Sequence, residues 1–307
     1  MSTSGARVVV AVLTYKRPQT LAALLPVLGA QCAEVPDSAS VLVVDNDPAA
    51  SARDLVSANG FAYEHEATPG ISAARNRALE VALERGFDVL VFIDDDELPV
   101  PGWLSSLLTT WRSTGADGVV GQVESEFEGT LDPWIAAGGF FTRRRLPTGT
   151  PVTVAATNNL LLCLPAVAAR GLRFDERLGL IGGEDTLFTR TLTGTGGTLV
   201  WCAEASVTDV VPAARMTRKF VVQRAFRYGA TATRVEVALA SGVAGRLVVR
   251  LRQTATAATR LAAGLARLAL GTVTFSPGRR AAGVRNLARG CGLLSGLVGY
   301  VPSQYAR

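Results

Sequence analysis

Residues 88–99 read DVLVFIDDDELP, an apolar run that passes into four consecutive acidic residues. Asp88–Ile93 has the length and the β-branched content of a short buried strand. Because four adjacent carboxylates repel one another, they need a counter-cation, and a hard divalent ion such as Mg²⁺ or Mn²⁺, shared with phosphate oxygens, supplies one. The alternative interpretation is a solvated acidic turn, or caps for the helix that we expect at Trp103–Trp111.

The sequence before this strand alternates between strand-like and helical patterns. The predicted elements are strands at Arg7–Leu13 and Val41–Val44 and helices at Thr20–Leu28 and Ser72–Arg85. Asp45-Asn46-Asp47-Pro48 ends the second strand as a turn, and Gly86 stops the second helix. This alternation predicts an α/β fold, a parallel sheet with helices on its faces. Ligands of such sheets bind at the carboxyl ends of the strands, where the acidic run falls.

Residues 118–212 contain further strand-like runs, at Gly118–Val123, Thr153–Leu164 and Thr198–Trp201. Between the first two of these lies Trp134–Thr150, which is rich in Gly, aromatic and Arg residues, and which we interpret as a mobile loop over a site. From about Arg215 the pattern turns helical, with arginines recurring through Ala- and Leu-rich sequence. The sequence therefore predicts a sheet-forming part followed by a helical part.

A second acidic signal is Gly182-Gly183-Glu184-Asp185, which precedes a helical run at Thr186–Leu192. Acidic residues early in a helix are stabilised by the positive end of the helix dipole, which is the simpler explanation. The functional interpretation is a general base that takes a proton from an attacking hydroxyl.

Length and composition limit the classes of protein to consider. The chain has 307 residues, 48% of them hydrophobic, enough for two domains or for one large α/β domain with an appendage. The four cysteines are far apart, which argues against a disulfide framework or a zinc site and for a reducing cytoplasm. No secretory signal is recognisable, and no stretch reaches the roughly 18 to 20 apolar residues of a membrane-spanning helix. We therefore expect a protein that is neither exported nor integral to a membrane.

Taken together, the motifs resemble those of family 2 glycosyltransferases of the GT-A fold. In that family's order, they are Thr14–Pro18 (TYKRP), Val43–Asp47 (VVDND), Gly70–Asn76 (GISAARN), Asp94–Asp96, Thr157–Asn159 and Gly183–Asp185. The resemblance covers roughly residues 7–230. It implies a Rossmann-like, mostly parallel sheet with flanking helices in a catalytic domain at residues 1–230, followed by a basic helical tail at residues 231–307.

The resemblance also implies a site for a nucleotide-sugar donor. The loop after the first strand would wrap the base, which Asp45 would hydrogen-bond. Arg75 would pair with phosphate oxygens, Asp94 would approach the ribose, and one of two asparagines would touch the donor sugar. The donor-binding set is Thr14, Tyr15, Arg17, Asp45, Arg75, Asn76, Asp94, Asp95, Asn158 and Asn159.

By the same resemblance, Asp96 of the Asp-x-Asp motif would bind the metal that bridges the diphosphate, and Asp185 would be the catalytic base, with Glu184 as the rival candidate. A single displacement would then invert the anomeric configuration. Family members often carry a histidine in the segment that reads VTDVVP here, where Asp209 could replace it as a metal ligand. We interpret His65, the one histidine of the chain, as structural or surface-exposed.

Charge is distributed unevenly along the chain. Residues 1–212 carry 15 Lys and Arg against 25 Asp and Glu, whereas residues 213–307 carry 16 against one, Glu236. A basic amphipathic helix followed by the short apolar segment Gly290–Tyr300 suits a position in the membrane interface. The alternative is a helical appendage whose arginines pair with the acids of the catalytic domain. Nucleic-acid binding is disfavoured, because the tail is apolar and lacks interleaved aromatic residues.

We therefore predict a cytoplasmic enzyme, peripheral on the inner face of the membrane, that uses Mn²⁺ or Mg²⁺ to extend a lipid-linked or cell-envelope glycan. Four arginines after the catalytic region would face an acidic or phosphorylated acceptor: Arg215, Arg218, Arg224 and Arg227. The alternatives are a soluble transferase that decorates a small molecule and a non-catalytic protein that binds nucleotide sugars. Asp45 is compatible with a uracil or thymine base, and guanine stays open.

Overall fold

The computed structural model of the chain describes residues 5–301, which form two compact units. The first, which we call the sheet unit, comprises residues 5–124, 144–180 and 184–209. The second, the helical unit, comprises residues 125–143, 181–183 and 210–301. Residue 231, the predicted start of the tail, lies inside a helix of the helical unit.

The sheet has the strand order β3-β2-β1-β4-β8-β6-β9-β5, with β7 paired to β9. Four strands are parallel: β1 (Arg7–Thr14), β2 (Ser38–Asp45), β3 (Ala62–His65) and β4 (Val89–Asp94). The others are β5 (Glu97–Pro99), β6 (Gly118–Phe127), β7 (Pro151–Val152), β8 (Asn159–Cys163) and β9 (Leu199–Val211). β8 is antiparallel to β4 and to β6, so the sheet is mixed.

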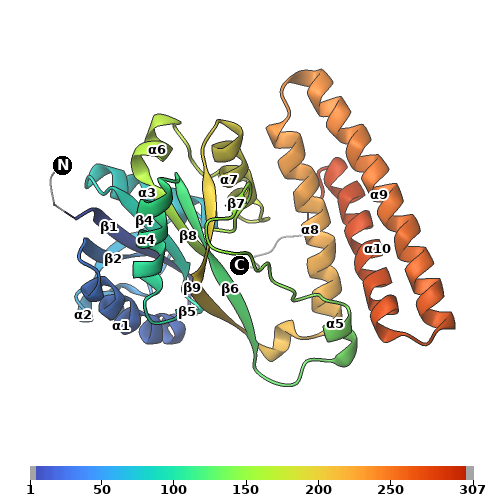
Figure 1. Cartoon of the computed structure of the whole chain (residues 1–307), viewed down its shortest axis with the longest axis horizontal. Coiled ribbons are helices and arrows are strands. Elements are labelled where there is room, and N and C mark those ends of the chain that lie inside the picture. Colours follow the sequence, from blue (N-terminus) through green and yellow to red (C-terminus); the bar gives the residue numbers. More distant parts are fainter. Residues whose placement is uncertain (1–4, 302–307) are drawn as a thin grey trace. The chain divides into compact units, whose positions relative to one another are not determined.

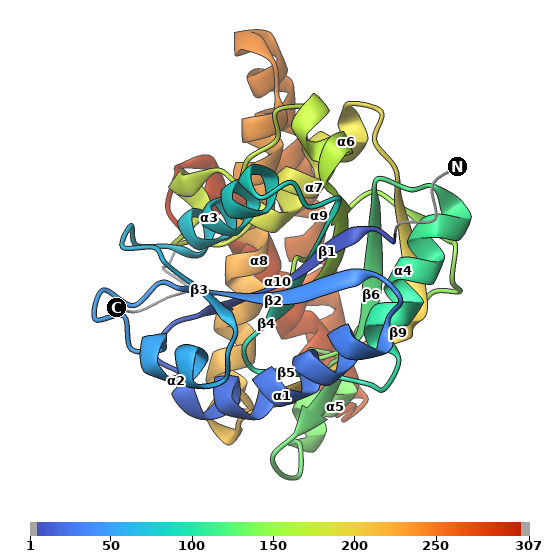
Figure 2. The ribbon, with the colours of Figure 1, turned by 90° about the vertical axis from the view of Figure 1, so that its left-hand side faces the viewer.

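Alternation along the strands explains how helices cover both faces of the sheet (Figure 2). In β1, Val8, Val10 and Val12 pack with α1 (Pro18–Glu34) and α4 (Trp103–Thr114), and α2 (Arg53–Ala58) joins this core. Val9 and Ala11 pack with the helices of the opposite face. Those are α3 (Ile71–Glu84), α6 (Leu164–Ala169) and α7 (Glu184–Gly194). Successive side chains of a strand point to opposite faces, so one sequence builds both cores.

Strand register brings the polar ends of the parallel strands to one edge. Thr14 lies opposite Asp45, Asp45 opposite His65, and Leu13 opposite Asp94. Carboxyl ends of parallel strands are where ligands of open α/β sheets bind. The edge is therefore the place to examine for a site.

The helical unit consists mainly of α8 (Arg218–Leu239), α9 (Gly242–Val273) and α10 (Pro277–Leu297), with α10 lying between the other two (Figure 1). The short α5 (Pro133–Ala137) packs on α10, and a single 3₁₀ turn, η2 (Ala213–Arg215), precedes α8. No helix within residues 5–301 combines the length and the apolar character needed to cross a bilayer.

Glycines let these helices approach closely. A Cβ added at Gly292 of α10 would lie 2.0 Å from the carbonyl oxygen of Phe226 in α8, and one at Gly229 would lie 2.2 Å from that of Arg289. On the other side of α10, Gly283 contacts Gly264 of α9. Axis separation depends on the side chains at the contact, so residues without a Cβ allow the backbones to touch.

The structure confirms the predicted α/β class and the mostly parallel N-terminal sheet, and it corrects two details. Of the predicted strand Thr153–Leu164, only Asn159–Cys163 is extended. Leu164 begins α6, because Pro165 occupies the first turn of a helix, where a missing N–H costs nothing. Trp134–Thr150, predicted as a loop, begins inside α5, which Asp132 caps by accepting a hydrogen bond from the Trp134 N–H.

The glycine contacts give a prediction for stability. Gly292→Ala would force α8 and α10 apart, and we expect it to lower the free energy of unfolding by about 1–3 kcal/mol, the usual cost of overpacking. Thermal and urea unfolding followed by circular dichroism measure this loss. Gly245→Ala in α9 is the control, because its added Cβ meets nothing closer than 3.9 Å. Equal stability of the two variants would contradict the proposed close packing.

Candidate active site

The acidic run after β4 is held by an arginine from the loop after β1. Arg17 Nη1 lies 2.8 Å from Asp95 Oδ1 and 2.7 Å from Asp96 Oδ2. The Thr14 hydroxyl also donates to Asp95, at 2.8 Å. Burial raises the pKa of Asp95, and Arg17 and Thr14 oppose part of this rise. Asp95 is therefore a buried anchor, whereas Asp96 stays partly exposed.

A second arginine, Arg75 of α3, forms a buried ion pair with Glu184, the first residue of α7. Both side chains are about 95% buried, with exposures of 6% and 5%. The Arg75 guanidinium also lies 5.6 Å from the centre of the Phe174 ring and attracts Asp94 electrostatically. Burial raises the pKa of Asp94 to about 7, with Arg75 opposing the rise and the neighbouring carboxylates adding to it. Arg75 thus lies among the acidic residues of two elements.

The structure adds Glu97 to the predicted residues. It is 3% exposed, it accepts a hydrogen bond from the Asn158 amide, and its Oε2 is buried without a hydrogen-bond partner among the described residues. In the pairing of β5 with β9, Glu97 lies opposite Asp209. Burial raises the pKa of Glu97, and the nearby Asp94 and Asp209 raise it further. The sequence gives no signal for Glu97, because the burial of Glu97 and Pro99 with Leu98 exposed is the reverse of what hydrophobicity predicts.

Several polar residues predicted for donor binding have their hydrogen bonds within the chain. Asp45 is fully buried and accepts hydrogen bonds from the N–H groups of Asp47 and Ala52. Asn76 exchanges hydrogen bonds with the Phe174 backbone. Asn159 accepts one from Trp103 and donates two to backbone carbonyls. Asp45 ends β2 and Asn159 begins β8 opposite Ile93, whereas Asn76 lies on α3. Contact of these residues with a donor stays a prediction.

The two candidate bases differ in environment. Glu184 is buried and engaged by Arg75, and burial raises its pKa. Asp185 is partly exposed, and its Oδ1 accepts a hydrogen bond of 2.5 Å from the Thr186 N–H. His65 is partly buried and lies 2.9 Å from the Asp47 carbonyl oxygen through Nε2.

Known proteins share both the sequence pattern and the fold of this chain. Residues 9–165 match the model of the family described as Glycosyl transferase family 2. The chain is 36% identical, over 242 residues and 76% of each chain, to the succinoglycan biosynthesis protein ExoM of Rhizobium meliloti (strain 1021). This chain belongs to glycosyl transferase family 2.

Comparison with solved structures shows that this chain has the GT-A fold. The mannosyltransferase PcManGT from Pyrobaculum calidifontis, in complex with GDP-Man and Mn²⁺, has a TM-score of 0.60 at 16% sequence identity. The match covers 95% of this chain and 88% of the PcManGT chain. S. aureus TarS 1–349 in complex with UDP-GlcNAc has a TM-score of 0.51 at 15% identity, covering 93% and 90%. For a longer TarS chain the TM-score is 0.53 at 17% identity, covering 80% of this chain and 41% of that one.

The acidic edge of this chain has donors of the kind that a hard cation uses. Asp94, Asp96, Glu97 and Asp209 offer carboxylate oxygens, the ligands that Mg²⁺ and Mn²⁺ prefer. The buried Glu97 Oε2 has no hydrogen-bond partner among the described residues, so its chemistry fits such an ion. Within residues 5–301, no three His, Cys, Asp or Glu side chains form a ready-made metal cluster. Arg17 instead neutralises part of the charge.

The buried ion pair gives a prediction that separates the two acids of α7. Glu184→Gln leaves the Arg75 charge buried without its partner, and we expect a loss of about 3–5 kcal/mol in the free energy of unfolding. Asp185→Asn, on a partly exposed side chain, should change it by less than about 0.5 kcal/mol. Urea unfolding measures both.

A double variant, Arg75→Met with Glu184→Leu, tests the same pair from the other direction. Removing both charges avoids an unpaired buried ion, so the double variant should be more stable than Glu184→Gln. Wild-type stability of Glu184→Gln would contradict a structural role for the pair.

Proposed function

We propose that the chain is an inverting glycosyltransferase that moves a sugar from a nucleoside-diphosphate donor to a hydroxyl of a lipid-linked or cell-envelope glycan. The observation that carries this proposal is the group of carboxylates at the carboxyl edge of the sheet, flanked by Arg17 and Arg75. Carboxylates bind a cation and arginines bind phosphate, which are the two requirements of a nucleoside diphosphate. The Mn²⁺ and the nucleotide sugars bound by PcManGT and TarS support this assignment.

At the donor end, Asp96 and Asp209 are the proposed metal ligands, with Asp94 directed to the ribose. A bound Mn²⁺ or Mg²⁺ would stabilise negative charge on the leaving diphosphate. Arg17 already contacts Asp96, so its guanidinium is within reach of a group bound there. Asn158, held by Glu97, is favoured over Asn159 for the donor sugar, because the amide of Asn159 is used by the fold.

At the acceptor end, Asp185 is the proposed base. Glu184, the rival, is engaged in a buried ion pair, which leaves its neighbour as the better proton acceptor. A carboxylate that deprotonates the acceptor hydroxyl on one face of the sugar, while the diphosphate leaves from the other, inverts the anomeric centre in a single displacement. The ExoM relative, named for succinoglycan biosynthesis, supports a polysaccharide as the product.

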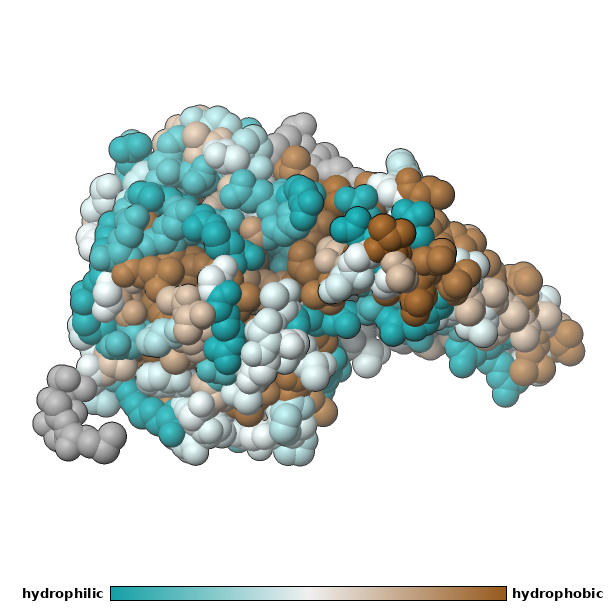
Figure 3. Space-filling view, turned by 90° about the horizontal axis from the view of Figure 1, so that it is seen from above, coloured by the Kyte–Doolittle hydropathy of each residue, from teal (hydrophilic) through white to brown (hydrophobic). Residues whose placement is uncertain are grey.

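The helical unit supports attachment to a membrane surface. Gln253, Ala257, Gly264 and Gly271 of α9 are buried, and Gly264 and Gly271 contact α10. At 100° per residue, the outward face therefore carries the exposed Leu247, Leu251, Leu265 and Val273. We call these four residues the α9 apolar stripe. Figure 3 shows hydrophobic residues over the end of the picture where the C-terminal helices lie. We assign the stripe to the inner leaflet of the membrane, with basic residues attracted by anionic lipids.

The donor site gives a prediction for ligand binding. We expect one nucleoside diphosphate sugar to raise the melting temperature in the presence of Mn²⁺, because a ligand that binds only the folded state stabilises it. Asp96→Ala should lose the Mn²⁺-dependent part of the shift. Asp185→Asn should keep the shift but hydrolyse or transfer the donor roughly 10²–10⁴-fold more slowly. Asp54→Asn, on an exposed turn of α2, is the control.

Two outcomes would contradict the assignment. An unchanged Mn²⁺-dependent shift in Asp96→Ala would exclude it as a metal ligand. No shift with any nucleotide sugar would favour the non-catalytic alternative.

The α9 apolar stripe gives a separate prediction. Leu251→Glu with Leu265→Glu removes two apolar side chains from the stripe, each worth about 1.5 kcal/mol or more on burial, so partitioning into phosphatidylglycerol vesicles should fall about a hundredfold. Vesicle sedimentation measures it, with Leu83→Glu in α3, 39% exposed, as the control. Failure of the wild-type chain to bind vesicles would favour the soluble transferase of small molecules.

A further inference from the structure

A group of partly buried arginines lies on α8, α9 and α10 of the helical unit. The group, which we call the arginine cluster, consists of Arg224, Arg260, Arg285 and Arg289, with the exposed Arg267 nearby. Burial lowers the pKa of Arg285, and Arg267 and Arg260 lower it further. Burial, Arg285, Arg260 and Arg224 do the same for Arg289. Positive charges therefore lie near one another in a partly dehydrated environment.

No ion pair among the described residues joins Arg260, Arg285 or Arg289 to a carboxylate of the helical unit. Its sequence contains four: Glu126, Glu128, Asp132 and Glu236. Asp132 pairs with Arg218 at 2.8 Å, and Glu236 pairs with Arg252 at 2.5 Å. Glu128 accepts from the Ala213 N–H at 3.1 Å, and Glu126 is exposed on β6. Against these four stand 16 Lys and Arg in the same unit. Among the described residues, Arg285 and Arg289 therefore lack the paired carboxylate that a buried cation normally requires.

Local contacts hold two members of the cluster, Arg224 and Arg285. Arg285 Nη1 donates to the Gly139 carbonyl and Arg224 Nη2 to the Phe140 carbonyl, both at 2.6 Å. The Arg224 guanidinium lies 4.3 Å from the centre of the Phe141 ring. The Nε–H groups of Arg285 and Arg289 are buried without a hydrogen-bond acceptor among the described residues. Arg224 and Arg285 are thus held in place, and Arg285 and Arg289 each keep a buried N–H donor without an acceptor among the described residues.

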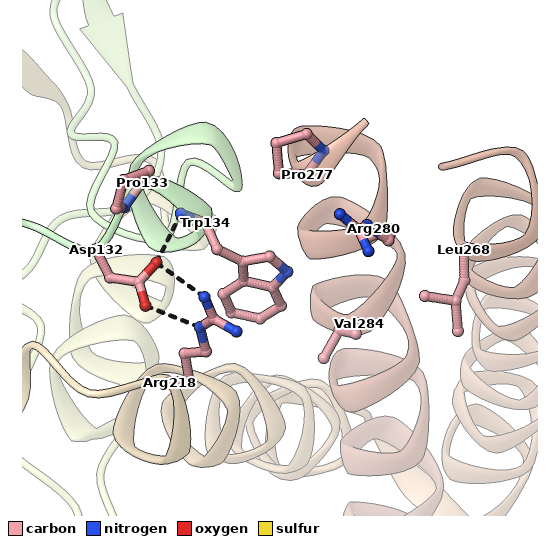
Figure 4. Close-up of a pocket in the computed structure, with 8 residues that line it drawn as sticks. All are labelled: Asp132, Pro133, Trp134, Arg218, Leu268, Pro277, Arg280 and Val284. Atoms are coloured by element: carbon pink, nitrogen blue, oxygen red, sulfur yellow. Dashed lines mark hydrogen bonds and ion pairs between the residues drawn. The ribbon is translucent and has the colours of Figure 1, made fainter. Parts of the chain in front are cut away.

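A cavity of about 410 Å³ opens at the α5 end of the same unit. Trp134 and Arg280 face this space from α5 and α10, and Leu268 of α9 and Val284 also line it (Figure 4). Arg280 Nε, like that of Arg285, is buried without an acceptor among the described residues. Arg285 directly follows Val284, and its partner Gly139 follows α5. The cavity and the cluster therefore share α10 and the α5 segment.

We propose that the arginine cluster binds the phosphate or diphosphate of a lipid-linked acceptor. Guanidinium groups recognise phosphate through paired, charge-assisted hydrogen bonds, and a phosphate supplies a negative charge beside Arg285 and Arg289 and acceptor oxygens for their guanidinium groups. The cavity beside the cluster, which the Trp134 indole helps to line, accommodates the group attached to the phosphate. Assignment to the acceptor rests on the proposed transfer reaction, whereas phosphate binding does not.

The test uses the full chain in EDTA, so that the metal-dependent donor site is silent, with farnesyl diphosphate as the soluble probe in calorimetry. We expect Arg285→Gln and Arg289→Gln each to weaken binding at least about tenfold, the effect of losing one charge-assisted contact. Arg279→Gln is the matched control, because Arg279 is exposed on the same helix and bonds to Thr274. Unchanged affinity in both variants would overturn the proposal.

The stability of the free protein provides a second readout. If the cluster serves to bind a ligand, Arg289→Gln removes the repulsion between Arg289 and the neighbouring arginines. The variant should then keep or raise the melting temperature measured without the probe. It should lose the rise in melting temperature that farnesyl diphosphate causes in the wild type. A drop of several degrees without probe, together with an undiminished rise on adding it, would overturn the proposal and leave a structural role.

Phosphatidylglycerol vesicles separate the two sources of phosphate. Loss of farnesyl diphosphate binding with retained vesicle binding supports the acceptor, and loss of vesicle binding alone overturns it in favour of a phospholipid headgroup. The proposed transferase activity fails separately, through the absence of Mn²⁺-dependent nucleotide binding.

Discussion

The sheet unit depends on keeping several carboxylates together at the end of β4. Arg17 holds Asp95 and Asp96, and Arg75 attracts Asp94 while it pairs with Glu184. These contacts connect the loop after β1, α3 and the start of α7 to a single acidic edge. Without such cations the carboxylates would repel one another in a partly buried setting, which is costly. The fold therefore builds its proposed site and its own electrostatic compensation from the same residues.

This compensation has a chemical consequence. A cation that binds Asp96 competes with Arg17 for the same carboxylate, and a donor diphosphate would offer Arg17 an alternative anionic partner. Exchange of one ion pair for another keeps the total charge of the edge balanced with and without donor. Arg75 has no such freedom, because its buried pair with Glu184 also anchors α7. Of the two arginines, Arg17, which is 39% exposed, is the one suited to respond to a ligand.

Periodicity and turn residues are enough to predict three of the four parallel strands and the acidic edge, because each signal is local. The short edge strand β3 (Ala62–His65) is not predicted in this way. Side-chain partners were not predictable in this way. Asn158 and Asn159 are adjacent and chemically identical, yet strand alternation turns Asn159 into the core, against Trp103, and leaves Asn158 beside Glu97. Glu97 itself was hidden in the acidic run, since its importance comes from Asp209, which lies more than a hundred residues away in sequence and opposite it in the sheet.

The helical unit reverses the usual distribution of polarity. A solvated helical bundle buries apolar side chains and exposes charged ones. Here the outward face of α9 carries Leu247, Leu251 and Leu265, while Arg285 and Arg289 are partly buried between helices. Glycines at the helix contacts let the backbones pack directly against one another, so these contacts need no apolar side chains between the helices. A substrate that has a hydrocarbon chain and a phosphate requires both an apolar surface and a cationic site, so the acceptor that we propose would account for both features at once.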